Sequence, residues 1–193
     1  ELRQYMAGEV ERAGAKVRLN CEATIQMVNQ EKPDAVVVAA GSTPIMPDIP
    51  GVESAKVVGA IDVLSGVPCG NRVVVLGGEL VGCETADYLA AQGKKVTVTR
   101  RSNEMALKMS ERNRASLLGR LRKQGVTLMP AVKYERITAK GLVVTTKEGW
   151  SRTIEADTLV LATGAVPENK LAKELQNKSV ELHVIGDCQK PRN

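Results

Sequence analysis

The chain has 193 residues, 43% of them hydrophobic, which is enough for a packed core in one large domain or two small ones. Its formal net charge is +5, but the basic side chains are not interleaved with aromatic residues, so we expect no nucleic-acid partner. The four cysteines include no Cys-x-x-Cys pair and no segment is typical of a signal peptide or a membrane-spanning helix, so we expect no metal, no membrane partner and a reducing, cytoplasmic setting.

The first seventy residues predict short helices and strands joined by proline-rich and glycine-rich connections. In chain order we expect a helix at 1–14, a short strand at 16–19, a brief helix at 25–31, a buried strand at 34–40, a connector with three prolines at 44–51 and one helical turn at 62–64.

Residues 72–99 follow the order strand, glycine turn, helix and strand, which is typical of a dinucleotide-binding unit. The first glycine of the turn makes the tight bend, and the last allows the helix to pack closely on the strand. The turn supplies the first candidate cofactor-binding residues, which are Gly77, Gly78, Glu79, Leu80, Val81 and Gly82.

The second half of the chain repeats the alternation of helix and strand. We expect a helix at 110–124, a strand at 126–129, an antiparallel meander at 132–155, a buried strand at 157–162 and a last strand at 182–185. Together these elements predict an α/β, Rossmann-like fold, in which a parallel sheet is flanked by helices and accompanied by a small antiparallel meander.

Glu79 stands where the pattern Gly-x-Gly-x-x-Gly has its second glycine. A glycine at that place lets the pyrophosphate of the cofactor approach the main chain. A carboxylate adds bulk and a negative charge, and two unit charges a few ångströms apart repel by about 1 to 4 kcal/mol. The sequence leaves open whether the site is weakened or has lost dinucleotide binding, because Gly78 could give the loop enough freedom to turn Glu79 outward.

Arg100 and Arg101 follow the second strand of the unit, about 20 residues beyond the glycine turn. An acid at this place would bind the ribose 2′-hydroxyl of NAD, whereas an arginine suits the 2′-phosphate of NADP. The alternative is that both arginines are simply solvated. We therefore predict NADP as the cofactor, with NAD still possible.

A second kind of glycine turn occurs twice, each time after a buried strand and three residues before a proline. Small residues at a strand end allow close approach of either a ligand or another strand, and both alternatives remain open here. The candidate cofactor-binding residues in these two turns are Ala40, Gly41, Ala162, Thr163 and Gly164.

The pattern Gly-x-x-Leu-Val-Gly-x-Glu-x-Ala at 77–86, the two glycine–proline turns and Val184-Ile-Gly-Asp-Cys together resemble flavoproteins with two dinucleotide-binding domains. Ala162-Thr-Gly-Ala-Val-Pro, Leu171-Ala-Lys-Glu-Leu and the segment that follows His183 resemble more closely the C-terminal part of the old-yellow-enzyme-related reductases, such as 2,4-dienoyl-CoA reductase, enoate reductase and trimethylamine dehydrogenase. This resemblance extends over essentially the whole chain.

The resemblance implies that 1–65 is the later part of an FAD-type domain, that 66–165 is an inserted NAD(P)H-binding domain, and that 166–193 returns to the FAD-type domain. It also implies that Asp187 faces the ribityl or pyrophosphate part of the flavin and that Glu84 lies near the nicotinamide. The implied function is to pass hydride from NAD(P)H to FAD within a multidomain oxidoreductase of the NADH oxidase type.

The sequence has no second Gly-x-Gly-x-x-Gly turn to hold the FAD pyrophosphate, and it has no counterpart of the family's N-terminal barrel. We therefore expect a fragment whose partners are the missing barrel and the missing half of the FAD domain. FAD is expected only in the intact parent protein, no catalytic residue is assigned, and the isolated chain is expected to be inactive. The alternative is a non-catalytic docking domain with a degenerate, ADP-type site. The sequence does not indicate an oligomeric state.

Overall fold

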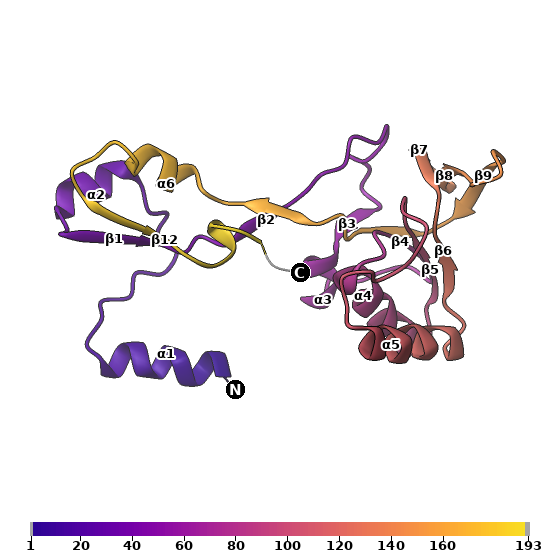
Figure 1. Cartoon of the computed structure of the whole chain (residues 1–193), viewed down its shortest axis with the longest axis horizontal. Helices are drawn as coiled ribbons and strands as arrows, with labels where there is room; N and C mark the ends of the chain where they lie inside the picture. Colours follow the sequence, from indigo (N-terminus) through magenta and orange to yellow (C-terminus); the bar gives the residue numbers. More distant parts are fainter. Residues whose placement is uncertain (1, 192–193) are drawn as a thin grey trace. The chain divides into compact units, whose positions relative to one another are not determined.

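The computed structural model describes residues 2–191, and Figure 1 follows them in the order of the sequence. These residues form two compact units. The smaller unit comprises 2–38 and Asn169–Ile185, and the larger comprises Ala39–Glu168 with the segment that begins at Gly186. Glu1, Arg192 and Asn193, which the predicted domain ranges include, lie outside the described residues.

The smaller unit pairs two strands that are far apart in the sequence. β1 (Ala35–Val38) lies parallel to β12 (Glu181–Val184), and α2 (Ile25–Glu31) packs near α6 (Lys170–Leu175). Thr24 caps α2, because its hydroxyl oxygen accepts a hydrogen bond of 3.3 Å from the amide of Met27.

The first helix, α1 (Leu2–Arg12), has no buried residue, although its sequence is amphipathic. The strand predicted at 16–19 is wrong, because these residues adopt no regular structure and Val17 and Leu19 are exposed. Alternating apolar residues favour a strand only where a neighbouring strand supplies hydrogen bonds, and no described strand pairs with this segment.

The core of the larger unit is a parallel sheet with the strand order β3, β10, β4, β5 and β6. The strands span Val57–Gly59, Thr158–Leu161, Arg72–Leu76, Lys95–Thr99 and Thr127–Met129 in that order. Four consecutive residues of β4, from Val73 to Leu76, are fully buried. Both faces of the sheet are therefore covered at its centre, which explains why β4 is a continuous apolar run from Val73 to Leu76.

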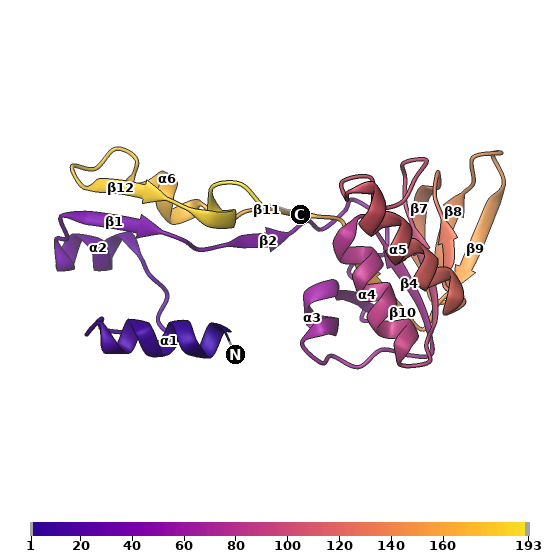
Figure 2. The ribbon, with the colours of Figure 1, turned by 60° about the horizontal axis from the view of Figure 1, so that its bottom comes forward.

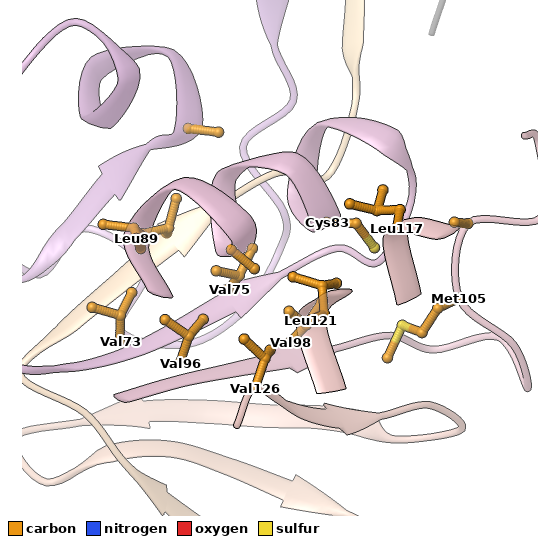
Figure 3. Packing of buried hydrophobic residues seen from close by; sticks show 14 of the residues in the cluster. Val73, Val75, Cys83, Leu89, Val96, Val98, Met105, Leu117, Leu121 and Val126 are labelled. Carbon is orange, nitrogen blue, oxygen red and sulfur yellow. The ribbon is translucent and has the colours of Figure 1, made fainter. Parts of the chain in front are cut away.

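Helices cover one face of this sheet. Val73 and Val75 of β4 join the buried side chains of α4 (Leu80–Ala91) and α5 (Glu111–Lys123) in one apolar cluster, to which α3 (Ala60–Leu64) also contributes. Figure 3 shows Leu117 and Leu121 of α5 within this cluster. The helix predicted after the glycine turn within 72–99 and the helix predicted at 110–124 are confirmed.

The predicted antiparallel meander is confirmed, and it covers the other face of the parallel sheet. It consists of β7 (Lys133–Thr138), β8 (Gly141–Thr145) and β9 (Ser151–Glu155). Val74 and Leu76 of β4 point to this side and form a second apolar cluster with residues of β8. Figure 2 shows α4 and α5 on one side of the parallel strands and the meander on the other.

The two glycine–proline turns are brought together by a short antiparallel pair. β2 (Ser42–Pro44) pairs with β11 (Ala165–Pro167), two segments for which no strand is predicted. The carbonyl of Gly164 accepts a hydrogen bond from the amide of Ile45, and the carbonyl of Gly41 accepts one from the amide of Glu168. The turns are therefore bound to each other through their main chains, whatever ligand they also contact.

The parallel sheet begins before residue 66. β3 is its edge strand, and α3 belongs to the cluster on its helical face. No helix in the range 2–191 combines the length and the apolar character that are needed to cross a membrane.

An ion pair ties the beginnings of the two central strands together. The guanidinium of Arg72 donates to Asp157 Oδ1 at 2.7 Å, and the Arg72 amide donates to Oδ2 at 2.9 Å. The hydrogen bonds from Arg72 lower the pKa of Asp157 from 3.8 to about 2.

We expect an NMR titration to give a pKa of about 2 for Asp157, and Arg72→Ala to raise it towards 3.8. Because the folded-state pKa is lowered, the contribution of this carboxylate to stability is complete above its unfolded-state pKa of about 3.9 and is lost as the pH falls towards 2. A pKa of Asp157 that is the same in both proteins would contradict the assigned ion pair.

Candidate functional site

The carboxyl ends of the parallel strands meet at one edge of the sheet. Gly77 follows β4, Arg100 follows β5, and Ala162 follows β10. β5 and β6 lie on one side of β4, and β10 and β3 on the other, so the order of strands reverses at β4. Ligands of open α/β sheets bind outside the strand ends at such a reversal. A cavity of about 380 Å³ lies here, within the size range of small-molecule sites.

Two glycines make the turn after β4 possible. Gly77 has a φ of +118°, and a Cβ atom on it would lie 2.1 Å from the carbonyl oxygen of Ala162. A Cβ atom on Gly82 would lie 1.9 Å from the carbonyl oxygen of Gly77. These distances mean that the turn packs directly on the end of β10 and that α4 packs directly on the turn.

The third glycine, Gly78, is held in place by the loop that follows Arg100. Its carbonyl accepts hydrogen bonds from the Ala106 amide at 2.6 Å and from Arg100 Nη1 at 3.2 Å. A Cβ atom on Gly78 would lie 2.3 Å from Met105 Sδ. The loop therefore does not have the freedom at Gly78 that the sequence suggested.

Glu79 begins α4 with an extended backbone, at φ −87° and ψ −168°. This conformation is open to any residue, so no strain arises from the missing glycine. Its carboxylate forms an ion pair with the guanidinium of Arg100 and accepts a hydrogen bond of 3.3 Å from the amide of Lys108. The side chain is 22% exposed and is directed to the end of β5.

The two arginines at the end of β5 have different surroundings. Arg100 is only 13% exposed at its side chain, and it bonds both Glu79 and the carbonyl of Gly78. Arg101 lines the cavity and is exposed, and it forms no ion pair with any residue in the range 2–191. Lys108 also lines the cavity, and its ammonium has no ion-pair partner among these residues.

Tyr134 of β7 lines the same cavity, and no motif in the sequence signals its presence there. Its hydroxyl lies 3.2 Å from Thr99 Oγ1 at the end of β5. Burial raises the pKa of Tyr134, and the hydrogen bond with Thr99 offsets only part of this effect. The phenol is therefore protonated at neutral pH, and its oxygen can donate a hydrogen bond to a ligand.

Cys83 of α4 lies beneath the glycine turn, with its sulfur 3.6 Å from the carbonyl oxygen of Gly78. Burial, followed by the negative charge of Glu79, raises the pKa of Cys83 to about 11. The group is therefore a thiol at neutral pH and a weak nucleophile. All four cysteines of the chain are free, and no group of potential metal ligands occurs within 2–191.

The structure brings most of the predicted site residues to this one cavity. Those that line it are Gly77, Gly78, Glu79, Val81, Arg100, Arg101, Ala162, Thr163, Gly164 and Asp187. The others do not line it: Leu80 packs against the helical core, Gly82 lies under the turn, Glu84 is exposed on α4, Ala40 is exposed and Gly41 joins the β2–β11 pair.

Comparison with known proteins gives a consistent result. Residues 2–188 match the family of pyridine nucleotide-disulphide oxidoreductases. An NADH oxidase of Thermoanaerobacter brockii is 37% identical over 192 residues, covering 96% of this chain and 30% of that protein. A bilirubin reductase of Mediterraneibacter gnavus is 36% identical, covering 96% of this chain and 29% of the relative. A solved 2-naphthoyl-CoA reductase complex has a TM-score of 0.90 at 34% identity, covering 98% of this chain and 29% of that one.

The chain thus spans about 30% of the length of these relatives. The predicted Rossmann-like α/β fold is confirmed, and the family implies FAD and NAD(P)H as cofactors. Since the match covers nearly the entire chain, the chain belongs to the pyridine nucleotide-disulphide oxidoreductase family.

Proposed function

We propose that the larger unit is the NAD(P)H-binding module of a flavoprotein oxidoreductase. The observation that carries this proposal is the cavity at the ends of β4, β5 and β10, beside a glycine turn that packs directly on the end of β10 and under the start of α4. Main-chain amides at the beginning of α4 suit the pyrophosphate of a dinucleotide, and the basic side chains beside them suit its negative charge. When bound, the nicotinamide would supply a hydride to the flavin of the intact protein.

We further propose that NADP is the favoured dinucleotide. Arg101 and Lys108 both line the cavity, and both lack an ion-pair partner within 2–191. A 2′-phosphate carries at most two negative charges. Arginine binds such a group through bidentate, charge-assisted hydrogen bonds. Tyr134 adds a neutral hydrogen-bond donor to the same cavity.

The whole protein is proposed to be a multidomain reductase of the old-yellow-enzyme-related group. The chain covers about 30% of its relatives, and α1 presents exposed apolar side chains at Leu2, Tyr5 and Met6. Such a surface suits a covering domain, and the missing half of an FAD domain would supply one. The division into an FAD-type domain and an inserted NAD(P)H-binding domain remains part of this proposal, as do the roles of Asp187 and Glu84, but the inserted domain then begins before residue 66, because β3 and α3 belong to its sheet and core. The four free thiols support a reducing, cytoplasmic setting.

A docking domain without hydride chemistry is the second candidate, and the carboxylate of Glu79 in the glycine turn is the observation that favours it. Because Arg100 holds that carboxylate at the end of β5, its charge is partly neutralised. We therefore favour the binding of a complete dinucleotide over the degenerate site.

Arg101→Ala tests the choice of dinucleotide. We expect it to weaken NADPH binding about 10- to 100-fold, the usual effect of losing a hydrogen bond to a charged group, and to change NADH binding less than about 3-fold. Isothermal titration calorimetry of both nucleotides measures this.

Arg112→Ala, on the exposed surface of α5, is the control for the loss of one positive charge. Tighter binding of NADH than of NADPH by the unaltered chain would contradict the preference for NADP. Equal weakening of both nucleotides by Arg101→Ala would remove Arg101 from the 2′-phosphate site.

A further inference from the structure

We propose that Glu79 is a specificity-determining residue, which restrains the preference for NADPH by holding Arg100 away from the 2′-phosphate. This inference rests on the proposed function, because it assigns a task to a side chain within the proposed dinucleotide cavity. It differs from the glycine-turn rule, in which a residue at this place only interferes with the pyrophosphate.

The first support is the way in which Arg100 is bound. Its stem lies along Gly78, since a Cβ atom on Gly78 would be 3.1 Å from Arg100 Cβ and 3.3 Å from Cδ. One terminal nitrogen donates to the carbonyl of Gly78, and the other bonds the carboxylate of Glu79. The two terminal nitrogens of Arg100, which could otherwise bind a phosphate, are thus already bound to residues of the glycine turn.

The second support is the low exposure of the pair. The side chain of Arg100 is 13% exposed and that of Glu79 is 22% exposed, whereas the pair of Arg120 with Asp87 on α4 is 50% and 22% exposed. Water screens a shielded pair less than an open one, so the attraction between Arg100 and Glu79 is stronger than that between Arg120 and Asp87. The amide of Lys108 gives the carboxylate of Glu79 a second hydrogen bond and fixes its direction.

The third support is the position of the carboxylate at the end of β5. An acid at this strand end is the feature that selects NAD in dinucleotide-binding units. Here the strand ends in arginines, but Glu79 brings a carboxylate to the same place from the turn, 21 residues earlier. A 2′-phosphate would meet both a repelling carboxylate and an occupied arginine, whereas a 2′-hydroxyl would meet no repulsion.

The effect of Glu79 on the choice between NADPH and NADH can be separated from its effect on binding of the pyrophosphate. Removal of the Glu79 charge relieves the repulsion of the pyrophosphate for NADH and NADPH alike. Release of Arg100 helps only the nucleotide with a 2′-phosphate. The ratio of the two affinities therefore reports the proposed role, and their common change does not.

The experiment is calorimetric titration of NADPH and NADH into the 193-residue chain and into the variants Glu79→Gln, Glu79→Ala, Arg100→Ala and Glu79→Gln/Arg100→Ala. We expect both single Glu79 variants to raise the ratio of NADPH affinity to NADH affinity about tenfold. We expect the double variant not to show this rise. Asp87→Asn is the matched control, because it removes one negative charge and an ion pair from the same helix outside the cavity. Thermal unfolding verifies that each protein is folded. If Glu79→Gln does not fold, Glu79→Ala provides the test.

Each outcome bears on the inference. A tenfold rise in the ratio that depends on Arg100 supports it. Nucleotide binding with an unchanged ratio in both Glu79 variants overturns it and leaves the proposed function intact. A rise of equal size in Asp87→Asn also overturns it, since general charge would then be the cause. Absence of binding of either nucleotide to every protein overturns the proposed function and this inference together.

Discussion

Gly82→Ala is expected to lower the free energy of unfolding of the larger unit by about 3 kcal/mol, at the upper end of the usual range for overpacking. Its Cβ atom would lie 1.9 Å from the carbonyl oxygen of Gly77 and 3.3 Å from the Cβ of Ala162. Both neighbouring atoms belong to residues that line the cavity and pack against each other. We therefore expect α4 to be displaced from the turn. Urea unfolding measures the change, and NADPH binding should weaken with it.

Gly119→Ala is the matched control for this prediction. Gly119 lies inside α5, and a Cβ atom there would have no neighbour within 4 Å. Because alanine is the better helix former, this variant should be more stable by about 0.5 to 1 kcal/mol. A loss of stability of similar size in both variants would show that close packing of α4 on the turn is not the cause.

Leu121→Ala is expected to lower the free energy of unfolding by about 3 kcal/mol, within the range measured for buried leucines. Leu121 is fully buried between α5 and the sheet, where Figure 3 shows it near Val98 of β5 and Val126. The opposite face of α5 is basic and exposed, so the buried leucines of this helix are what pack it on the core.

Leu107→Ala is the control, because Leu107 is 50% exposed and its loss should change the stability by less than about 0.5 kcal/mol. Chemical denaturation of both variants provides the comparison. Similar, small effects in the two variants would contradict the assigned core.

Four of the five strands of the parallel sheet could be predicted because each of them carries its own signal, whereas no strand was predicted for β3 at Val57–Gly59. The run from Val73 to Leu76 is apolar on both faces, the glycine turn follows it directly, and the helical period begins within four residues. These signals are local, so the sequence alone is sufficient to place them. The meander was equally clear, because its strands are joined by glycine turns at Gly141 and Gly149.

Pairings between distant segments could not be predicted. The β2–β11 pair joins Thr43 to Val166, and its short strands contain prolines that favour a turn in isolation. The prediction of a strand at 16–19 was wrong for the opposite reason. Polar and apolar residues alternate there, but no strand among the described residues pairs with the segment. In both cases tertiary contacts, rather than local preference, decide the structure.

The candidate site was predicted in its parts but not in its connections. Glu79 and Arg100 were treated as two separate departures from the pattern, although they bond each other. Parallel neighbours β4 and β5 end at the same edge, so topology alone indicates that the turn and the strand end are close. Tyr134 and Lys108 enter the cavity from the meander and from a loop, and no spacing rule relates these segments to the glycine turn.

The most direct test of the dinucleotide cavity is an NMR titration of the isotope-labelled chain with NADPH. We predict that the largest amide shifts occur at Gly77, Gly78, Arg101 and Thr163, which line the cavity at the strand ends. Shifts that are absent there and concentrated on another surface, such as the basic face of α5, would contradict the account.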